Sequence, residues 1–282
     1  MCTSPVTTTD IIVRTLAQFS GGQDWRLGLA QDHPNHLLLW ITRGQGRLLL
    51  DGQRRGLGPH NALFLPAGHL FALDLGRQSL GFVVSIPDGS PLRLPGLPTH
   101  LRIRDVHVQA ELTGLIDGAQ REQTNGRPLQ QDALEAHAAL MSVWLRRQVA
   151  EGDHAPERRN AAARLSARFC HLVSSHYTSG APMASYAEML AVTPTHLTRS
   201  VKTATGKTAA DLLTERTLYE ARRLLAETRH PAQDIARHLG FGSPAYFTRF
   251  IQHHTGKPPS QLRKPATSAA QPAARLSERA AG

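Results

Sequence analysis

The chain has 282 residues, 40% of them hydrophobic, and a formal net charge of +10. This length and hydrophobic content predict a globular protein with two packed domains. Two cysteines without partners at metal-ligand spacing exclude a disulfide framework or a zinc cluster. The N-terminus lacks the pattern of a signal peptide, and the apolar runs, such as residues 37–41, are far shorter than the roughly 18 residues of a membrane span. We therefore expect a soluble cytoplasmic protein that does not contact the membrane.

The positive charge is concentrated in the second half of the chain. Residues 1–150 hold 14 Lys and Arg against 12 Asp and Glu, whereas residues 157–264 hold 16 against 7. All four lysines, Lys202, Lys207, Lys257 and Lys264, lie in the second half. This excess predicts a polyanionic partner for that half, with a solvated basic surface as the alternative.

Residues 36–86 have the pattern of an antiparallel β unit. The runs HLLLWI and GRLLLDG are separated by the Gly-rich stretch TRGQG, and ALFLPAG and LGFVVSIP continue the series with Gly and Pro between strands. Several short strands at this spacing predict a sandwich or a small barrel.

From about residue 105 the hydrophobic period becomes helical. The run QDALEAHAALMSVWLRRQVAE aligns apolar side chains on one helix face, namely Leu134, His137, Met141, Trp144 and Leu145. We expect Leu134, Met141, Trp144 and Leu145 to form the interface of a homodimer. The alternative is that this stripe covers the β unit of its own chain.

Composition also suggests where the domains end. Residues 151–160 are polar and interrupted by Gly and Pro, which predicts a linker, and residues 265–282 are rich in Ala, Pro and Ser, which predicts a disordered tail. We expect an α+β protein with a sensing domain over 1–104, a helical dimerisation segment over 105–150, a linker over 151–164 and an all-α domain over 165–264.

Two stretches of the second half repeat each other. TPTHLTRSVKTATGK (193–207) aligns without gaps on SPAYFTRFIQHHTGK (243–257) at an offset of 50, with identical Pro, Thr, Arg, Thr, Gly and Lys positions. In each copy Thr or Ser caps the first free amides, Pro fits the first helical position and Gly ends the helix. Each copy is therefore predicted to be a helix of about 12 residues.

A shorter predicted helix precedes each copy, so that two helix-turn-helix units lie near 183–206 and 232–256. Spacing turns Leu197 and Val201, and Phe247 and Ile251, inward. The helix over 208–227 between the units spans roughly 30 Å at 1.5 Å per residue, close to the separation of successive major grooves on one side of DNA. The chain is thus predicted to carry two reading helices one turn of DNA apart.

The region MASYAEMLAV…IARHLGFGSPAYFTRFIQHHTGKPPSQLRK, about 80 residues, resembles the DNA-binding domain of AraC/XylS-type transcription regulators. The resemblance implies direct base contacts from outward positions of both recognition helices, namely Thr195, Thr198, Arg199, Ala245, Tyr246 and Arg249. Phosphate contacts are expected from residues further along or just beyond these helices, namely Lys202, Lys207, Gln252 and Lys257. The first unit departs more from the family pattern, with Ala191 in place of a frequent Gly and Ser200-Val201 in place of an aromatic pair.

The N-terminal half is similar, more loosely, to the cupin-like effector and dimerisation domains of the same family, through TRGQGRLLLDGQ and LFLPAG. Catalytic cupins bind metal through His and carboxylate clusters, but Phe71 stands where a His commonly follows the Pro-x-Gly turn. His60 and His69 lack a nearby carboxylate or His partner in sequence, so no metal and no cofactor are expected. Trp40 and Phe82 are either the lining of a small-molecule cavity or plain core.

These features together predict a sequence-specific transcription regulator without enzymatic activity. Its expected partners are two adjacent major grooves of double-stranded DNA per subunit, a small-molecule effector at an unknown site and a second copy of the chain, with RNA polymerase as a further candidate. One alternative is a metal-dependent cupin enzyme with a regulatory DNA-binding tail. Another is an architectural protein that binds DNA without sequence preference.

Overall fold

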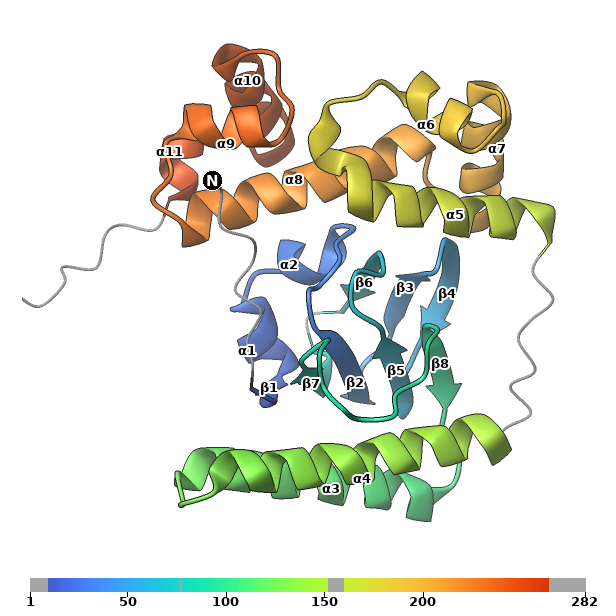
Figure 1. Ribbon diagram of the computed structural model, residues 1–282, viewed down its shortest axis with the longest axis vertical. Coiled ribbons are helices and arrows are strands. Elements are labelled where there is room, and N and C mark those ends of the chain that lie inside the picture. The colour runs from blue at the N-terminus through green and yellow to red at the C-terminus, as the bar shows by residue number, and fades with distance from the viewer. Residues whose placement is uncertain (1–9, 77, 152–159, 264–282) are drawn as a thin grey trace, which may run out of the picture.

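The computed structural model describes residues 10–76, 78–151 and 160–263, and the predicted tail over 265–282 lies outside this part. Strands dominate its N-terminal region and helices its C-terminal region, as Figure 1 shows. The predicted α+β class is therefore confirmed. The N-terminal elements are β1 (Ile12–Thr15), α1 (Leu16–Ser20), α2 (Trp25–Gly28), β2 (His36–Arg43), β3 (Gly46–Leu50), β4 (Gln53–Leu57), β5 (Asn61–Leu65), β6 (Phe71–Leu75), β7 (Leu80–Ile86), β8 (Thr99–Arg102), α3 (Val106–Asn125) and α4 (Gln130–Glu151).

The strands form two antiparallel sheets, and those described do not close into a barrel. One sheet has the order β1-β7-β2-β5-β8 and the other β4-β3-β6. A hydrophobic cluster made mostly of leucines fills the space between them, and it includes Phe71 and Leu73 of β6 and Val83 of β7. Strand β2 is buried along most of its length because both of its faces are covered, Leu37, Leu39 and Ile41 by the second sheet and Leu38 and Trp40 by helices.

Helices α3 and α4 cover the outer face of the larger sheet (Figure 1). The predicted apolar stripe, Leu134, Met141, Trp144 and Leu145, is buried in this layer, each side chain 1% exposed within a single chain. The Trp144 indole donates a hydrogen bond to the Val108 carbonyl at 3.2 Å. These four side chains therefore cover the sheet of their own chain, which corrects the expectation that they face a second subunit.

The C-terminal region consists of α5 (Ala161–His176), a 3₁₀ helix η1 (Tyr177–Ser179), α6 (Met183–Met189), α7 (Pro194–Thr205), α8 (Ala209–Glu227), α9 (Ala232–His238), α10 (Pro244–Thr255) and α11 (Pro259–Leu262). Helix α5 starts at Ala161, four residues before the expected start of this domain, because the Asn160 side chain caps it. It packs against α7 through Phe169 and Val173. The remainder of the predicted linker, 152–159, lies outside the described residues.

The elements form layers with the N-terminal sheets in the middle (Figure 1). Helices α3 and α4 lie on one side, and the C-terminal helices lie on the other, joined by the long helix α8. Leu49 and Ala72 of the smaller sheet belong to the same buried cluster as Leu197 and Val201 of α7. The C-terminal helices therefore pack directly on the smaller sheet.

Candidate nucleic-acid interface and interdomain pocket

Helices α7 and α10 have the same end structure, which follows from their repeated sequence. Thr193 Oγ1 accepts a hydrogen bond from the His196 amide, and Ser243 Oγ from the Tyr246 amide, both at 3.2 Å. Proline occupies the first turn of both helices. Gly206 and Gly256 end them with φ of 79° and 69°, a left-handed conformation that glycine adopts at little cost. Both helices are thus fixed at each end by local chemistry.

The predicted base-reading side chains lie on the outward faces of these helices. Leu197, Val201, Phe247 and Ile251 are buried, as their spacing predicted. Thr195, Arg199, Ala245, Tyr246 and Arg249 are exposed, and Thr198 is half-buried. The structure thus places these positions where a duplex could reach them, and their contact with bases stays a prediction.

An aromatic cluster supports the second of these helices. The ring centroid of Phe241 lies 5.7 Å from that of Tyr246, 5.2 Å from Phe247 and 5.1 Å from Phe250. Phe247 is buried, whereas Tyr246 at the rim of the cluster is 55% exposed. The aromatic residues of this stretch therefore hold α10 in place, and Tyr246 alone among these four presents a largely free edge to the surface.

The predicted phosphate-binding residues divide into two groups. Lys202, Gln252 and Lys257 are exposed. Lys207 instead forms an ion pair with Glu215, with Nζ 2.6 Å from Oε1 and 2.7 Å from Oε2. Glu215 Oε2 also accepts a hydrogen bond from the Ala30 amide at 3.3 Å. The Glu215 carboxylate therefore contacts both Lys207 and the N-terminal region. Lys207 is engaged in an ion pair, unlike the other three residues, and its contact with a phosphate stays a prediction.

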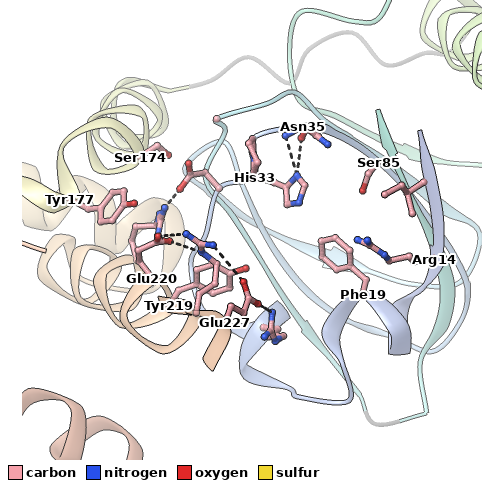
Figure 2. A pocket seen from close by; sticks show the side chains of 17 residues that line it. Arg14, Phe19, His33, Asn35, Ser85, Ser174, Tyr177, Tyr219, Glu220 and Glu227 are labelled. Atoms are coloured by element: carbon pink, nitrogen blue, oxygen red, sulfur yellow. Dashed lines mark hydrogen bonds and ion pairs between the residues drawn. The ribbon is translucent and has the colours of Figure 1, made fainter. Parts of the chain in front are cut away.

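A pocket of about 490 Å³ lies between the β region and α8. Figure 2 shows Arg14, Phe19, His33, Asn35 and Ser85 of the N-terminal region around it, facing Tyr177 of η1 and Tyr219, Glu220 and Glu227 of α8. Ile12 of β1 pairs with Ser85 of β7, and both residues line the pocket. The pocket is therefore built jointly by the two halves of the chain.

A chain of ion pairs lines the α8 side of this pocket. Arg216, 4% exposed at its side chain, binds Asp32 through Nε and Glu220 through Nη1 at 3.2 Å. Arg223 binds Glu220 at 2.6 Å and Glu227 at 3.5 Å, and Glu227 binds Arg26 at 2.6 Å. This series of ion pairs thus begins at Asp32 and ends at Arg26, both in the N-terminal region. The Arg216 guanidinium also lies over the Tyr177 ring, 3.7 Å from its centroid.

The opposite side of the pocket holds polar groups without an ionic partner. The Arg14 guanidinium has no ion pair or hydrogen bond with the rest of the described chain, and the buried Asn35 Oδ1 has no hydrogen-bond partner there. His33 lies near Arg14, and burial lowers the pKa of its imidazole to about 4. His33 is therefore neutral at pH 7, so Arg14 contributes an unbalanced positive charge to this side of the pocket.

The aromatic residues suggested for a cavity lie elsewhere. Trp40 is buried beneath α3, where its indole donates to Thr113 Oγ1 at 3.1 Å, and Phe82 packs against the same cluster. Both are therefore core residues. The imidazole of His60 lies near Trp40, tilted to its indole, with 5.9 Å between the ring centroids. Over the described residues, the structure contains no group of three or more His, Cys, Asp or Glu that could hold a metal ion and no helix able to cross a membrane.

Comparison with known proteins adds to this geometry. Residues 186–265 match the family model described as a helix-turn-helix domain. The chain is similar to the arabinose operon regulatory protein of Salmonella typhimurium, at 29% identity over 93 residues, 33% of this chain and 32% of that protein. The protein of the same name from Escherichia coli is 28% identical over 95 residues, with the same coverage of 33% and 32%. The match thus spans about a third of the length of these curated relatives.

Solved structures also resemble this chain. The crystal structure of ToxT from Vibrio cholerae O395 aligns with 89% of this chain and 96% of its own, at a TM-score of 0.41 and 13% identity. The DNA-binding domain of AdpA in complex with a target DNA aligns with 34% of this chain and 86% of its own, at a TM-score of 0.32 and 18% identity.

Proposed function

Because the C-terminal region belongs to the AraC/XylS family of helix-turn-helix domains, we propose that this protein is a sequence-specific, DNA-binding regulator of transcription. The observation that carries the proposal is the pair of equally capped helices, each presenting an exposed arginine, Arg199 or Arg249, one turn into the helix. Helix α8 joins the two units over 19 residues, roughly 28 Å. Two major-groove faces about 34 Å apart are a fitting target for such a pair.

An effector site in the interdomain pocket is the second part of the proposal. Arg14 supplies a positive charge without a partner among the described residues, and Ile12 and Phe19 supply apolar surface. A pocket of about 490 Å³ is in the range that holds a small organic molecule. Since the ion pairs of α8 line the same pocket, a bound ligand would change how α8 is held against the N-terminal region.

The finer architecture is proposed on the same basis. The two sheets with the leucine core between them support an open, cupin-like sensing domain over 1–104, followed by a helical segment over 105–150 and a DNA-binding domain that begins at α5. Homodimerisation would use the outer face of α3 and α4, where Leu140 and Val149 are exposed. Their exposure is the support for this surface, since the inner stripe is already buried.

The proposed function is tested by comparing Arg249→Ala with Lys257→Ala in the full chain. The duplexes are a site selected from a random library by the wild-type protein and a scrambled version of it, each measured across a salt series. We expect Arg249→Ala to lose about 1–3 kcal/mol of discrimination between them, because a bidentate contact to a guanine edge carries sequence information. Lys257→Ala should weaken binding to both duplexes alike and lower the salt slope by about one.

Two results would contradict this. If the library yields no preferred site, the protein binds DNA without reading sequence. If Arg249→Ala weakens both duplexes equally, Arg249 is a phosphate contact and α10 is not a reading helix.

A further inference from the structure

A basic hollow of about 540 Å³ lies where the C-terminal end of α7 meets the β3–β4 hairpin. Four cations line it, Arg47, Arg54 and Arg55 from the hairpin and Lys202 from α7. No Asp or Glu is among its lining residues. This arrangement brings arginines of the N-terminal half, whose overall charge is nearly balanced, beside a predicted reading helix.

The hairpin is held firmly in this position by apolar and backbone contacts. Leu49 of β3 is 7% exposed and shares a buried cluster with Leu197 and Val201 of α7. Gly52, in the turn of the hairpin with φ of 67°, lies so close to Ser166 and Ala167 of α5 that a Cβ would overlap their backbone. The hairpin is thus anchored at its turn and on one face, which fixes where its arginines project.

Strand pairing puts two of the arginines on the face that meets α7. Arg54 of β4 lies opposite Leu49 of β3, and Arg47, two residues before Leu49, lies opposite Gly56. Because side chains alternate along a strand, Arg47, Leu49 and Arg54 share one face. The Arg54 guanidinium reaches the end of α7, where Nη1 is 3.3 Å from the place of a Cβ on Gly206. Leu49 therefore anchors the face, and the arginines extend past the end of the helix.

The positive charge of the hollow is not neutralised by the described protein. Arg47, Arg54, Arg55 and Lys202 take part in no ion pair within the described ranges. Arg55 donates from Nη2 to Gln53 Oε1 at 3.0 Å, but its buried Nε has no hydrogen-bond partner there. Asp74, opposite Arg47 on β6, lines an adjoining hollow that Arg47 and Arg54 also line, but among the described residues it forms an ion pair with neither of them. Four neighbouring cations of this kind repel one another and favour an anionic partner.

The hollow continues the outward stripe of α7. Thr195, Arg199 and Lys202 lie at i, i+4 and i+7 and therefore share one helix face. The step from Thr195 to Lys202 covers roughly 10 Å along the helix at 1.5 Å per residue. Lys202 belongs both to this stripe and to the lining of the hollow. A duplex lying on the stripe would thus bring its backbone toward the hairpin arginines.

We propose that the β3–β4 hairpin binds the phosphate backbone of the DNA that α7 reads, through Arg47 and Arg54 together with Lys202. The inference rests on the proposed function, because it takes the outward stripe of α7 as a DNA-binding face. The N-terminal region is then part of the DNA interface and not a sensing domain alone. Its contribution is independent of sequence, since arginine contacts to phosphate oxygens position a duplex without distinguishing bases.

The experiment compares two charge-matched double variants of the full chain. Arg47→Ala/Arg54→Ala removes two cations of the hollow, and Arg102→Ala/Arg104→Ala removes two exposed cations at the end of β8, beside α3 on the far side of the molecule (Figure 1). Binding to a random-sequence duplex of about 40 base pairs is measured over a salt series, with thermal unfolding of each variant as the folding check.

We expect the hairpin variant to lower the salt slope by about 1.8, two phosphate contacts at about 0.9 each. Between about 50 and 200 mM salt its affinity should therefore fall roughly tenfold less than that of the wild type. The Arg102→Ala/Arg104→Ala control should keep the wild-type slope, because its cations lie away from α7.

Equal slopes for the hairpin variant and the control would overturn the inference. A wild-type slope for the hairpin variant, together with binding of inorganic phosphate that this variant loses, would also overturn it and would identify a small-anion site. If the wild type binds no duplex at all, the proposed function is wrong. This result differs from an unchanged salt slope in the hairpin variant, so failure of the proposed function can be told from failure of this inference.

Discussion

The two helix-turn-helix units are alike in sequence but are attached to the rest of the chain in different ways. The first unit, α6 and α7, shares its hydrophobic core with Ala30, Leu49, Leu70 and Ala72 of the N-terminal region. The second unit, α9 and α10, forms its core with Leu218, Leu224 and Leu225 of α8, with Leu29 at the edge. The first is thus joined to the β region by apolar packing, whereas the second is joined mainly through α8.

This difference indicates which unit an effector could move. Helix α8 is held to the N-terminal region by the ion pairs of Arg216, Glu220, Arg223 and Glu227, which line the interdomain pocket. Ion pairs respond to a charged ligand, whereas a close-packed apolar core resists displacement. We therefore expect the first unit to be fixed relative to the β region and the second unit to shift when the pocket is filled.

The largest expected effect comes from breaking the ion pairs at their buried end. Arg216→Met leaves Asp32 and Glu220 without their cation, and it should lower the free energy of unfolding by about 3–5 kcal/mol, as measured by urea denaturation. Arg229→Met, at an exposed arginine in the segment after α8, is the matched control and should stay within about 0.5 kcal/mol of the wild type. A loss below about 1 kcal/mol for Arg216→Met would show that the ion pairs do not hold α8.

The turns of the two units offer a second contrast. Gly240 in the second turn has φ of 75°, and a Cβ there would overlap the backbone of Gly180. Gly240→Ala should therefore lower the free energy of unfolding by about 3 kcal/mol, combining steric overlap with left-handed strain.

The corresponding residue of the first turn, Ala191, has φ of 56° and is exposed. Ala191→Gly relieves the same backbone strain without a packing change, so it should raise the free energy of unfolding by up to about 1 kcal/mol. Thermal denaturation of both variants checks the pair. If both substitutions change the free energy of unfolding by the same small amount, Gly240 is not more tightly packed than Ala191.

The pocket should also give a pH signature through His33. Burial lowers the pKa of His33 to about 4, so the unfolded chain binds a proton at this residue at a higher pH than the folded chain does. The free energy of unfolding should therefore fall as pH decreases below about 6.5, by about 2 kcal/mol by about pH 5. His33→Gln should remove this slope, and the difference between variant and wild type isolates it from other groups. Parallel pH profiles would show that His33 titrates normally.

Local sequence predicted the parts of the structure that local chemistry fixes. The capped helices α7 and α10 and the strands β2, β3, β5 and β7 lie where their patterns placed them. Strand β4 (QRRGL) was not predicted, because it carries two arginines where a buried strand would have apolar residues. One of its faces is exposed, and its strand conformation is fixed by pairing with β3. The basic hollow beside α7 escaped prediction for the same reason.

Contacts between distant parts of the chain could not be predicted in this way. The ion pair of Asp32 with Arg216 joins residues 184 apart, and neither residue has an unusual sequence neighbourhood. The helical stripe of Trp144 was identified as apolar, but its period alone does not distinguish burial against the chain's own sheet from burial against a second copy. Lys207 and Lys257 occupy equivalent positions, just after α7 and α10. Their surroundings differ because Glu215 of α8 forms an ion pair with Lys207.

Whether α7 and α10 read successive major grooves can be measured by selecting binding sites from a random duplex library with three proteins. These are the wild type, Arg199→Ala and Arg249→Ala, all as full chains. The wild-type site should contain two preferred blocks about one helical turn, or about 10 base pairs, apart. Each variant should lose preference in one block and keep it in the other, since each lost guanine contact carries about 1–3 kcal/mol of discrimination. If all three proteins select the same single block, α7 and α10 do not each read a major groove.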